Sequence, residues 1–317
     1  MKKDLISIND LSKQEIITLL KLTRQLKTKL TSKARFTPLA GKTLALIFQK
    51  PSTRTRVSFQ VGMHQLGGVA IFLSGQDLQL KRGETLADTA KTLSRYINGI
   101  VIRANKHQDI IELAEYSTVS VINGLSDMEH PCQALCDIYT ILEKYKFKTS
   151  KFEEKIRQLN NIKITYIGDG NNVANSLLYV ASILGMKLSI STPKGYEPNG
   201  TIFNKSKQIA SNTGAVIELN SDPEQAVKNA DFIYTDVWTS MGQENEENTR
   251  KQLFQPYQVN KKLVDKANPN VLIMHCLPAH RGEEITTDIL ESDKSIVFDQ
   301  AENRLHMQKS ILTHLLK

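Results

Sequence analysis

The sequence predicts an α/β protein of two domains, each built on a parallel β-sheet flanked by helices. Strand-like apolar segments alternate with helical segments along the chain, which is the pattern of a parallel sheet covered on both faces. The length of 317 residues fits two domains, at roughly 150 residues per domain. A polar stretch at 146–155, rich in Lys, Ser, Thr and Glu, interrupts the alternation. We place the domain boundary there, which gives domains 1–147 and 148–317.

The first domain is predicted to begin with a helix, because Ser12 and Glu15 have the spacing of a capping box and apolar residues then recur at helical period. Its strands are expected at 44–49, 69–73, 99–103 and 119–123. Its further helices are expected at 58–66, at 86–96 and from 131 to about 145.

The second domain repeats this alternation. Its strands are expected at 162–167, 187–191, 215–219, 232–235, 271–275 and 295–298. Its helices are expected at 173–184, after 199 and at 224–229. A final helix at 302–316 has no strand after it, so it is free to pack elsewhere.

Composition narrows the function classes. The net charge is +8, but the basic residues are dispersed, which favours small anionic substrates over nucleic acid. The three cysteines have no framework spacing, so we expect a reducing compartment, with Cys132 and Cys136 as buried thiols. No apolar run approaches the roughly 20 residues that span a bilayer. We therefore expect a soluble, cytoplasmic protein that binds neither membranes nor nucleic acid.

A candidate anion site lies at Ser52, Thr53, Arg54 and Thr55, between a predicted strand and a predicted helix. Backbone N–H groups at a helix N-terminus favour anions, and arginine adds bidentate geometry for phosphate oxygens. The segment lacks the glycines of a Walker loop. A solvated turn with incidental charges is the alternative interpretation.

A second candidate is the segment that starts at His130. Pro131 suits the first turn of a helix, so His130 falls near the N-cap and Gln133 lies one turn further on. A histidine at a helix start tends to be neutral, and Gln133 offers both a donor and an acceptor to an amide-like group. A simple capping histidine is the alternative.

Three predicted strands of the second domain end in polar residues. The segment 168–172 contains Gly-x-Gly, but Val173 replaces the third glycine and no acidic residue follows the next strand, which argues against NAD. Its asparagines either bind a polar ligand or form a turn. Asp236 follows another strand, where it binds or deprotonates an amine, or else caps a turn. Adjacent strand residues point to opposite faces, so His275 is not expected to act as a base for Cys276.

Taken together and in this order, four segments resemble the ornithine carbamoyltransferases of the aspartate/ornithine carbamoyltransferase family. They are Ser52-Thr-Arg-Thr-Arg56, His130-Pro-Cys-Gln133, Asp236 with Ser240-Met-Gly242, and His275-Cys-Leu-Pro278. The resemblance extends over essentially the whole chain. The first two segments are common to the wider family, including the aspartate enzymes, whereas the last two favour ornithine as the acceptor.

The resemblance implies a reaction and an assembly. The first domain would bind carbamoyl phosphate and the second L-ornithine, with the last helix, 302–317, returning to the first domain. The carbamoyl group would pass to the δ-amine of ornithine, giving L-citrulline and phosphate in arginine biosynthesis. No cofactor and no metal would be needed. Relatives form homotrimers or multiples of trimers with shared active sites.

The resemblance also assigns site residues. Phosphate would be held by Ser52, Thr53, Arg54, Thr55, Arg103 and Arg304, with Gln79 from the adjacent subunit. Arg103 and His130 would polarise the carbamoyl oxygen, and Gln133 with the backbone of Cys276 and Leu277 would contact the carbamoyl amide. Ornithine would be held by Asn172, Asp236, Ser240 and Met241. The catalytic residues would be Arg103, His130, Asp236 and Cys276, the last two managing the amine and its proton.

Three alternatives stay open at this point. One is a carbamoyltransferase that uses putrescine, aspartate or an acylated ornithine. Another is a nicotinamide oxidoreductase, which would need the missing glycine and acidic residue. The third is a non-catalytic nucleic-acid-binding protein, suggested by the net charge and opposed by its dispersion.

Overall fold

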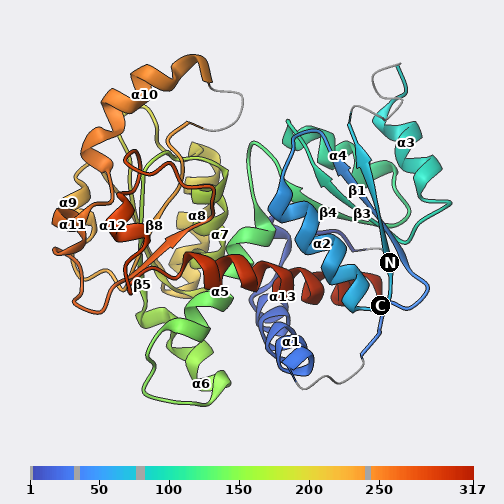
Figure 1. The fold of residues 1–317 in the computed structure, drawn as a ribbon, viewed down its shortest axis with the longest axis horizontal. Coiled ribbons are helices and arrows are strands. Elements are labelled where there is room, and N and C mark those ends of the chain that lie inside the picture. The colour runs from blue at the N-terminus through green and yellow to red at the C-terminus, as the bar shows by residue number, and fades with distance from the viewer. Residues whose placement is uncertain (1–2, 32–35, 76–82, 240–243) are drawn as a thin grey trace. The chain divides into compact units, whose positions relative to one another are not determined.

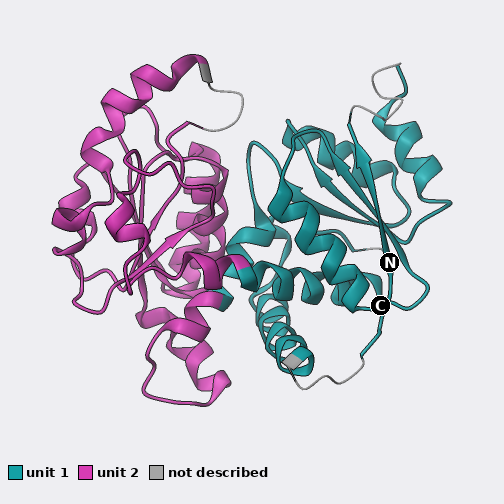
Figure 2. Ribbon diagram, viewed as in Figure 1, with its two compact units in different colours: residues 1–139, 302–317 teal, residues 140–301 magenta. Residues whose placement is uncertain are grey.

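The computed structural model describes residues 3–31, 36–75, 83–239 and 244–317. The chain divides into two compact units, residues 1–139 together with 302–317, and residues 140–301 (Figure 2). The division between residues 139 and 140 falls inside a helix, whereas the sequence suggested a boundary at 147, in the polar stretch that follows this helix.

Unit 1 contains a parallel four-stranded sheet in the order β2-β1-β3-β4 (Figure 1). Its strands are β1 (Thr43–Phe48), β2 (Val69–Ser74), β3 (Gly99–Arg103) and β4 (Ser120–Leu125). Its helices are η1 (Ile8–Asp10), α1 (Lys13–Thr31), α2 (Thr53–Gln65), α3 (Leu86–Leu93), α4 (His107–Tyr116), most of α5 (Pro131–Lys144) and most of α13 (Val297–Leu316).

Unit 2 contains a parallel five-stranded sheet in the order β7-β6-β5-β8-β9. Its strands are β5 (Lys163–Ile167), β6 (Lys187–Ser191), β7 (Val216–Asn220), β8 (Phe232–Thr235) and β9 (Leu272–His275). Its helices are α6 (Phe152–Arg157), η3 (Gln158–Asn161), α7 (Asn172–Leu184), α8 (Gly200–Thr213), α9 (Pro223–Ala226), η4 (Glu244–Glu246), α10 (Glu247–Phe254), η5 (Gln255–Tyr257), α11 (Lys261–Val264) and α12 (Thr287–Leu290). The prediction of two parallel sheets flanked by helices is confirmed.

The last helix, from residue 302 onward, belongs to unit 1 and lies beside α1 and α2 (Figure 1). Ser310 Oγ donates to the Leu19 carbonyl over 2.8 Å, and Lys309 Nζ donates to Gln65 over 2.9 Å. A Cβ on Gly99, where β3 begins, would lie only 2.6 Å from the side chain of Leu316. The glycine therefore permits the close approach of α13 to the sheet.

Several predicted elements differ from the structure. The helix expected at 86–96 ends at Leu93, the one expected at 224–229 spans only Pro223–Ala226, and α4 was not predicted. Residues 295–298 do not form a strand, because Ser295 makes only an isolated bridge to Ile273 and α13 already begins at Val297. The helix expected at 58–66 begins earlier, at Thr53, because the side chain of Ser52 caps it.

Both sheets have a point where the strand order reverses, between β1 and β3 in unit 1 and between β5 and β8 in unit 2. Open α/β sheets bind ligands at the carboxyl ends of the strands at such a point. In unit 1 these ends lead to Ser52 and Arg103, and in unit 2 they lead to Asp169 and Asp236. In the described part of the chain, no helix is long and apolar enough to cross a membrane.

Candidate active site

The anion segment of unit 1 forms the N-terminus of α2. Ser52 is the N-cap, and its Oγ accepts a hydrogen bond from the Thr55 backbone N–H over 3.3 Å. The same hydroxyl donates to Thr55 Oγ1 over 3.1 Å. The helix runs for 13 residues from Thr53, so its dipole favours an anion at this end.

Arg304 of α13 connects three residues that the sequence singled out. Its Nη2 donates to Thr55 Oγ1 over 2.8 Å, and its Nη1 donates to Gln133 Oε1 over 2.6 Å. The same Nη1 lies 3.4 Å from His130 Nε2. Arg304 is only 4% exposed, so these hydrogen bonds hold its guanidinium in place within a largely dry environment.

His130 is buried directly before α5, and the pKa of its imidazole lies well below the usual value. Burial is the largest cause, followed by the positive charges of Arg304, Arg103 and Arg54. The imidazole is therefore neutral at pH 7, as the sequence predicted for a histidine at a helix start. Three guanidinium groups that act on one buried imidazole make this a strongly cationic site.

The side-chain amide of Gln133 has a fixed orientation, because its Nε2 donates to Asp137 over 2.8 Å while its Oε1 accepts from Arg304. Asp137 is fully buried one helical turn further along α5. On the same helix, Cys132 and Cys136 are buried free thiols, as predicted. Burial raises the pKa of the Cys132 thiol to about 12, so this residue is an inert part of the core.

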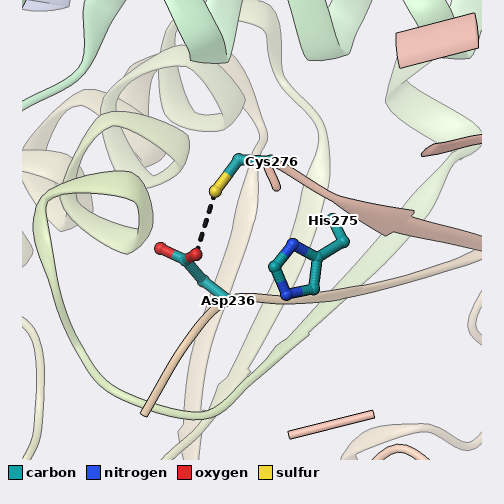
Figure 3. A group of neighbouring side chains, drawn as sticks. All are labelled: Asp236, His275 and Cys276. Atoms are coloured by element: carbon teal, nitrogen blue, oxygen red, sulfur yellow. Dashed lines mark hydrogen bonds between the residues drawn. The ribbon is translucent and has the colours of Figure 1, made fainter. Parts of the chain in front are cut away.

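Asp236 follows β8 in unit 2, and its carboxylate accepts three hydrogen bonds. Cys276 Sγ and the Val237 backbone N–H each donate to Oδ1 over 2.9 Å, and Asn171 Nδ2 donates to Oδ2 over 2.8 Å. Figure 3 shows the thiol of Cys276 directed at this carboxylate. The strand ends of β8 and β9 thus bring together Asp236 and Cys276, two of the predicted catalytic residues.

Asn171 is one of the two asparagines for which the sequence left a ligand-binding role and a turn role open, and in the structure it is the neighbour of Asp236. Its Oδ1 accepts from the backbone N–H groups of Val173 and Ala174, which caps α7, and its Nδ2 is then free to reach the carboxylate. The predicted Asn172 is the first residue of α7. An asparagine at a helix N-cap was a readable signal for the capping role, but not for the contact with Asp236.

His275 does not serve Cys276, which agrees with the expectation from strand geometry. Its Nδ1 accepts from the Leu277 backbone N–H over 2.8 Å, and its Nε2 lies 3.0 Å from Glu284 Oε1. The ligand atoms of Asp236, His275 and Cys276 lie within 4.8 Å of one another. Hydrogen bonds already engage both ring nitrogens and the thiol, so these atoms are occupied within the protein.

A second ionic cluster, which no sequence pattern indicated, lies close to Asp236. Arg250 Nη1 lies 3.2 Å from Asp169 Oδ2 and donates to the Trp238 carbonyl over 2.9 Å, and its Nε donates to Glu246 over 2.9 Å. Burial raises the pKa of Asp169 to about 6, although the charge of Arg250 opposes the increase. Arg250 therefore binds one residue before the segment 240–243, Trp238, and one residue after it, Glu246. The predicted residues Gln79, Ser240 and Met241 lie outside the described residues.

Comparisons with known proteins identify the family of both parts of the chain. Residues 3–143 match the family model of the aspartate/ornithine carbamoyltransferase carbamoyl-P binding domain, and residues 160–315 match that of the Asp/Orn binding domain. An ornithine carbamoyltransferase of Thermococcus kodakarensis is 52% identical over 312 residues, which cover 98% of this chain and 95% of that protein.

Two further relatives come from Pyrococcus furiosus. An anabolic ornithine carbamoyltransferase is 52% identical over 312 residues, covering 98% of this chain and 95% of the relative. The crystal structure of an ornithine carbamoyltransferase has a TM-score of 0.93 at 51% identity, and the match covers 99% of this chain and 97% of the other. This chain belongs to the aspartate/ornithine carbamoyltransferase family.

Proposed function

We propose that this protein transfers the carbamoyl group of carbamoyl phosphate to the δ-amine of L-ornithine, which gives L-citrulline and phosphate as a step of arginine biosynthesis. Full-length relatives that share about half of their residues with this chain are named ornithine carbamoyltransferases, and one of them is named as the anabolic enzyme. The observation that carries the proposal is the cationic site of unit 1, where Arg54, Arg103 and Arg304 act on a buried, neutral His130.

The carbamoyl phosphate half of the reaction needs a site that neutralises a leaving phosphate and stabilises an oxyanion. We assign the phosphate to Ser52, Thr53, Arg54, Thr55, Arg103 and Arg304. Arg103 and His130 polarise the carbamoyl oxygen, since a neutral imidazole can donate one hydrogen bond without adding charge. Gln133 and the backbone of Cys276 and Leu277 contact the carbamoyl amide.

The ornithine half needs a group that binds an ammonium and a place for the proton of the attacking amine. We assign this half to Asn172, Asp236, Ser240 and Met241. Asp236 is 6% exposed, and its carboxylate accepts a hydrogen bond from the thiol of Cys276. An amine that binds here can replace the thiol as the hydrogen-bond donor to this carboxylate. Asp236 and Cys276 position the δ-amine and manage its proton, and nucleophilic attack on the carbamoyl carbon follows from proximity.

The proposal includes a cytoplasmic homotrimer, or a multiple of trimers, in which Gln79 of one subunit completes the site of its neighbour. The family supports this arrangement. We expect the Gln79→Ala and Arg54→Ala variants to be inactive when each is assembled alone. A mixture of the two should regain activity after reassembly, because some active sites then combine an intact Arg54 from one subunit with an intact Gln79 from its neighbour. If the mixtures have no more activity than the separate variants, Gln79 acts within its own subunit or does not act.

Citrulline formation from carbamoyl phosphate tests the function, with ornithine, putrescine, aspartate and acetylornithine as competing acceptors. Ornithine should be used preferentially. Putrescine lacks the α-ammonium that would pair with Asp236, and acetylornithine has that amine neutralised, so each leaves a buried carboxylate without its cationic partner. Preferred carbamoylation of aspartate or putrescine would change the acceptor, and no carbamoylation of any acceptor would overturn the proposal.

A further inference from the structure

The end of strand β9 is held rigidly in the interior of unit 2. The His275 backbone N–H donates to Gln300 Oε1 over 3.0 Å, and Gln300 Nε2 donates to the hydroxyl of Tyr234 over 3.1 Å. All three residues are buried, and His275 is 0% exposed. The imidazole of His275 therefore projects from a fixed backbone position.

The hydrogen bonds of this imidazole determine its tautomer. Nδ1 faces the backbone N–H of Leu277 at 2.8 Å, so Nδ1 must accept and carries no proton. Nε2 faces Glu284 Oε1 at 3.0 Å, and the same oxygen accepts the backbone N–H of His280 over 2.6 Å. Glu284 Oε1 is thus an acceptor, and the proton of the neutral ring lies on Nε2.

Leu277 has a conformation that needs such support. Its φ is +58°, in the left-handed region that a leucine enters only at an energetic cost. The hydrogen bond from its N–H to His275 Nδ1 closes this turn. Cys276 lies between the two residues, and its thiol donates to Asp236. The imidazole therefore fixes the turn that carries both Cys276 and the Leu277 backbone.

We propose that His275, oriented by Glu284, is a positioning residue for carbamoyl transfer. Its unprotonated Nδ1 holds residues 276–277 in the conformation in which the Cys276 thiol and the Leu277 backbone meet the reacting groups. His275 itself touches neither substrate, because both ring nitrogens are engaged and the ring is fully buried. This inference rests on the function proposed above.

Two amide substitutions at the same position separate this role from a purely structural one. In His275→Asn the side-chain oxygen stands near the place of Nδ1, so the acceptor for Leu277 is kept. In His275→Gln the amide reaches the place of Nε2 and faces Glu284, and the acceptor for Leu277 is lost. Both variants bury one amide, so both should lower the melting temperature by similar amounts. His314→Gln, in the exposed last turn of α13, controls for the substitution itself.

We expect His275→Gln to lower kcat for citrulline formation by about tenfold to a hundredfold, since a lost hydrogen bond displaces groups at the reacting atoms. His275→Asn should remain within about threefold of the wild type. The dissociation constant for inorganic phosphate should change less than threefold in both variants, because the phosphate is assigned to residues of unit 1 alone. Equal kcat values for the Asn and Gln variants, at equal melting temperatures, would overturn the inference.

A measurement on the unaltered protein keeps the inference testable if neither variant folds. Nitrogen-15 spectra of histidine-labelled protein, with His275 assigned by comparison with labelled variants of the other histidines, should show a pyrrole-type Nε2 and a pyridine-type Nδ1. A proton on Nδ1 would overturn the inference. A wild-type protein that forms no citrulline would instead refute the proposed function, so the two failures are distinguishable.

Discussion

Arg304 donates a hydrogen bond of 2.6 Å to the side-chain oxygen of Gln133, which joins the last helix of the chain to α5. The same guanidinium reaches Thr55 at the start of α2. Three helices that are distant in sequence therefore meet in one polar network within unit 1. A site whose donors are held before the substrate arrives loses little energy in reorganising during the reaction, which is the condition for strong electrostatic stabilisation.

Arg304→Lys should weaken carbamoyl phosphate binding at least tenfold. Lysine keeps the positive charge but cannot donate to Gln133 and Thr55 at once, because it lacks the planar fork of the guanidinium. Isothermal titration with carbamoyl phosphate, or with phosphate as a competitor, measures the change. Arg95→Lys is the matched control, since Arg95 is exposed and precedes β3, at the opposite edge of the sheet. Similar dissociation constants for both variants would contradict the assignment of Arg304.

The neutral state of His130 predicts a pH dependence of stability. Its pKa is lowered in the folded protein, so below the unfolded value near 6.5 the unfolded chain binds a proton that the folded chain does not. The stability that His130 contributes is therefore complete above this pH and is lost as the pH falls. The difference in unfolding free energy between the wild type and His130→Gln should shrink from pH 7.5 to pH 5. A constant difference over this range would mean that folding leaves the pKa of His130 unchanged, and a growing difference would mean that the folded state favours the protonated ring.

Asp169 should show the opposite slope. Its pKa rises from 3.8 to about 6 in the folded protein, so between these values the folded chain binds the extra proton. Stability should increase as the pH falls from 7 to 4, relative to Asp169→Asn, by on the order of 2 kcal/mol. Denaturant unfolding of both proteins at each pH measures this. A difference that falls with decreasing pH would show that the ion pair with Arg250 dominates over burial.

Thiol reagents should distinguish Cys276 from the other two cysteines. Cys132 and Cys136 are buried, and the raised pKa of Cys132 removes its reactive thiolate, whereas Cys276 is partly exposed. Iodoacetamide should therefore label one thiol in the folded protein, three after denaturation and none in folded Cys276→Ala. Peptide mapping identifies the site. Labelling of Cys132 in the folded protein would contradict the burial of α5.

The central strands of both sheets were predictable from sequence because they are short apolar runs buried on both faces. The range of β3, 99–103, was predicted as it occurs, and all five of its residues are buried. Helix starts were harder. The first turn of α2 is Thr-Arg-Thr-Arg, which has no apolar period, and its N-cap Ser52 looks like an ordinary loop serine. The β-branched residues at 296–297 favoured a strand, but tertiary packing made Val297 the start of α13.

The site was predictable where one rule applied, namely that polar residues at strand ends gather at one edge of a parallel sheet. Asp236 and Cys276 were singled out in this way, whereas Arg103 was named only through the family resemblance. Their supporting partners were missed, because Arg250 and Glu284 lie on segments whose position relative to these strands depends on the whole fold of unit 2. A sequence pattern identifies which residues follow a strand, but not which distant side chain will stand beside them.

Asp236→Asn should separate ornithine recognition from carbamoyl phosphate binding. The substitution replaces one carboxylate oxygen by an amide nitrogen, so one of the three donors that converge on Asp236 faces another donor and the partner charge for an ammonium is lost. We expect kcat/KM for ornithine to fall at least a hundredfold, since a charged hydrogen-bonded pair is worth several kcal/mol when buried. Carbamoyl phosphate binding should stay within about threefold, because its phosphate is assigned to residues of unit 1.

Acceptor kinetics at saturating carbamoyl phosphate, beside calorimetric titration of carbamoyl phosphate itself, measure the two effects separately. Asp265→Asn is the control, because Asp265 is exposed and pairs only across one helical turn with Lys261 among the contacts described for it. That variant should behave as the wild type in both assays. If Asp236→Asn instead loses acceptor use and carbamoyl phosphate binding equally, and melts at a lower temperature, then Asp236 acts mainly by holding Asn171 and Cys276 together, and its place in ornithine binding must be withdrawn.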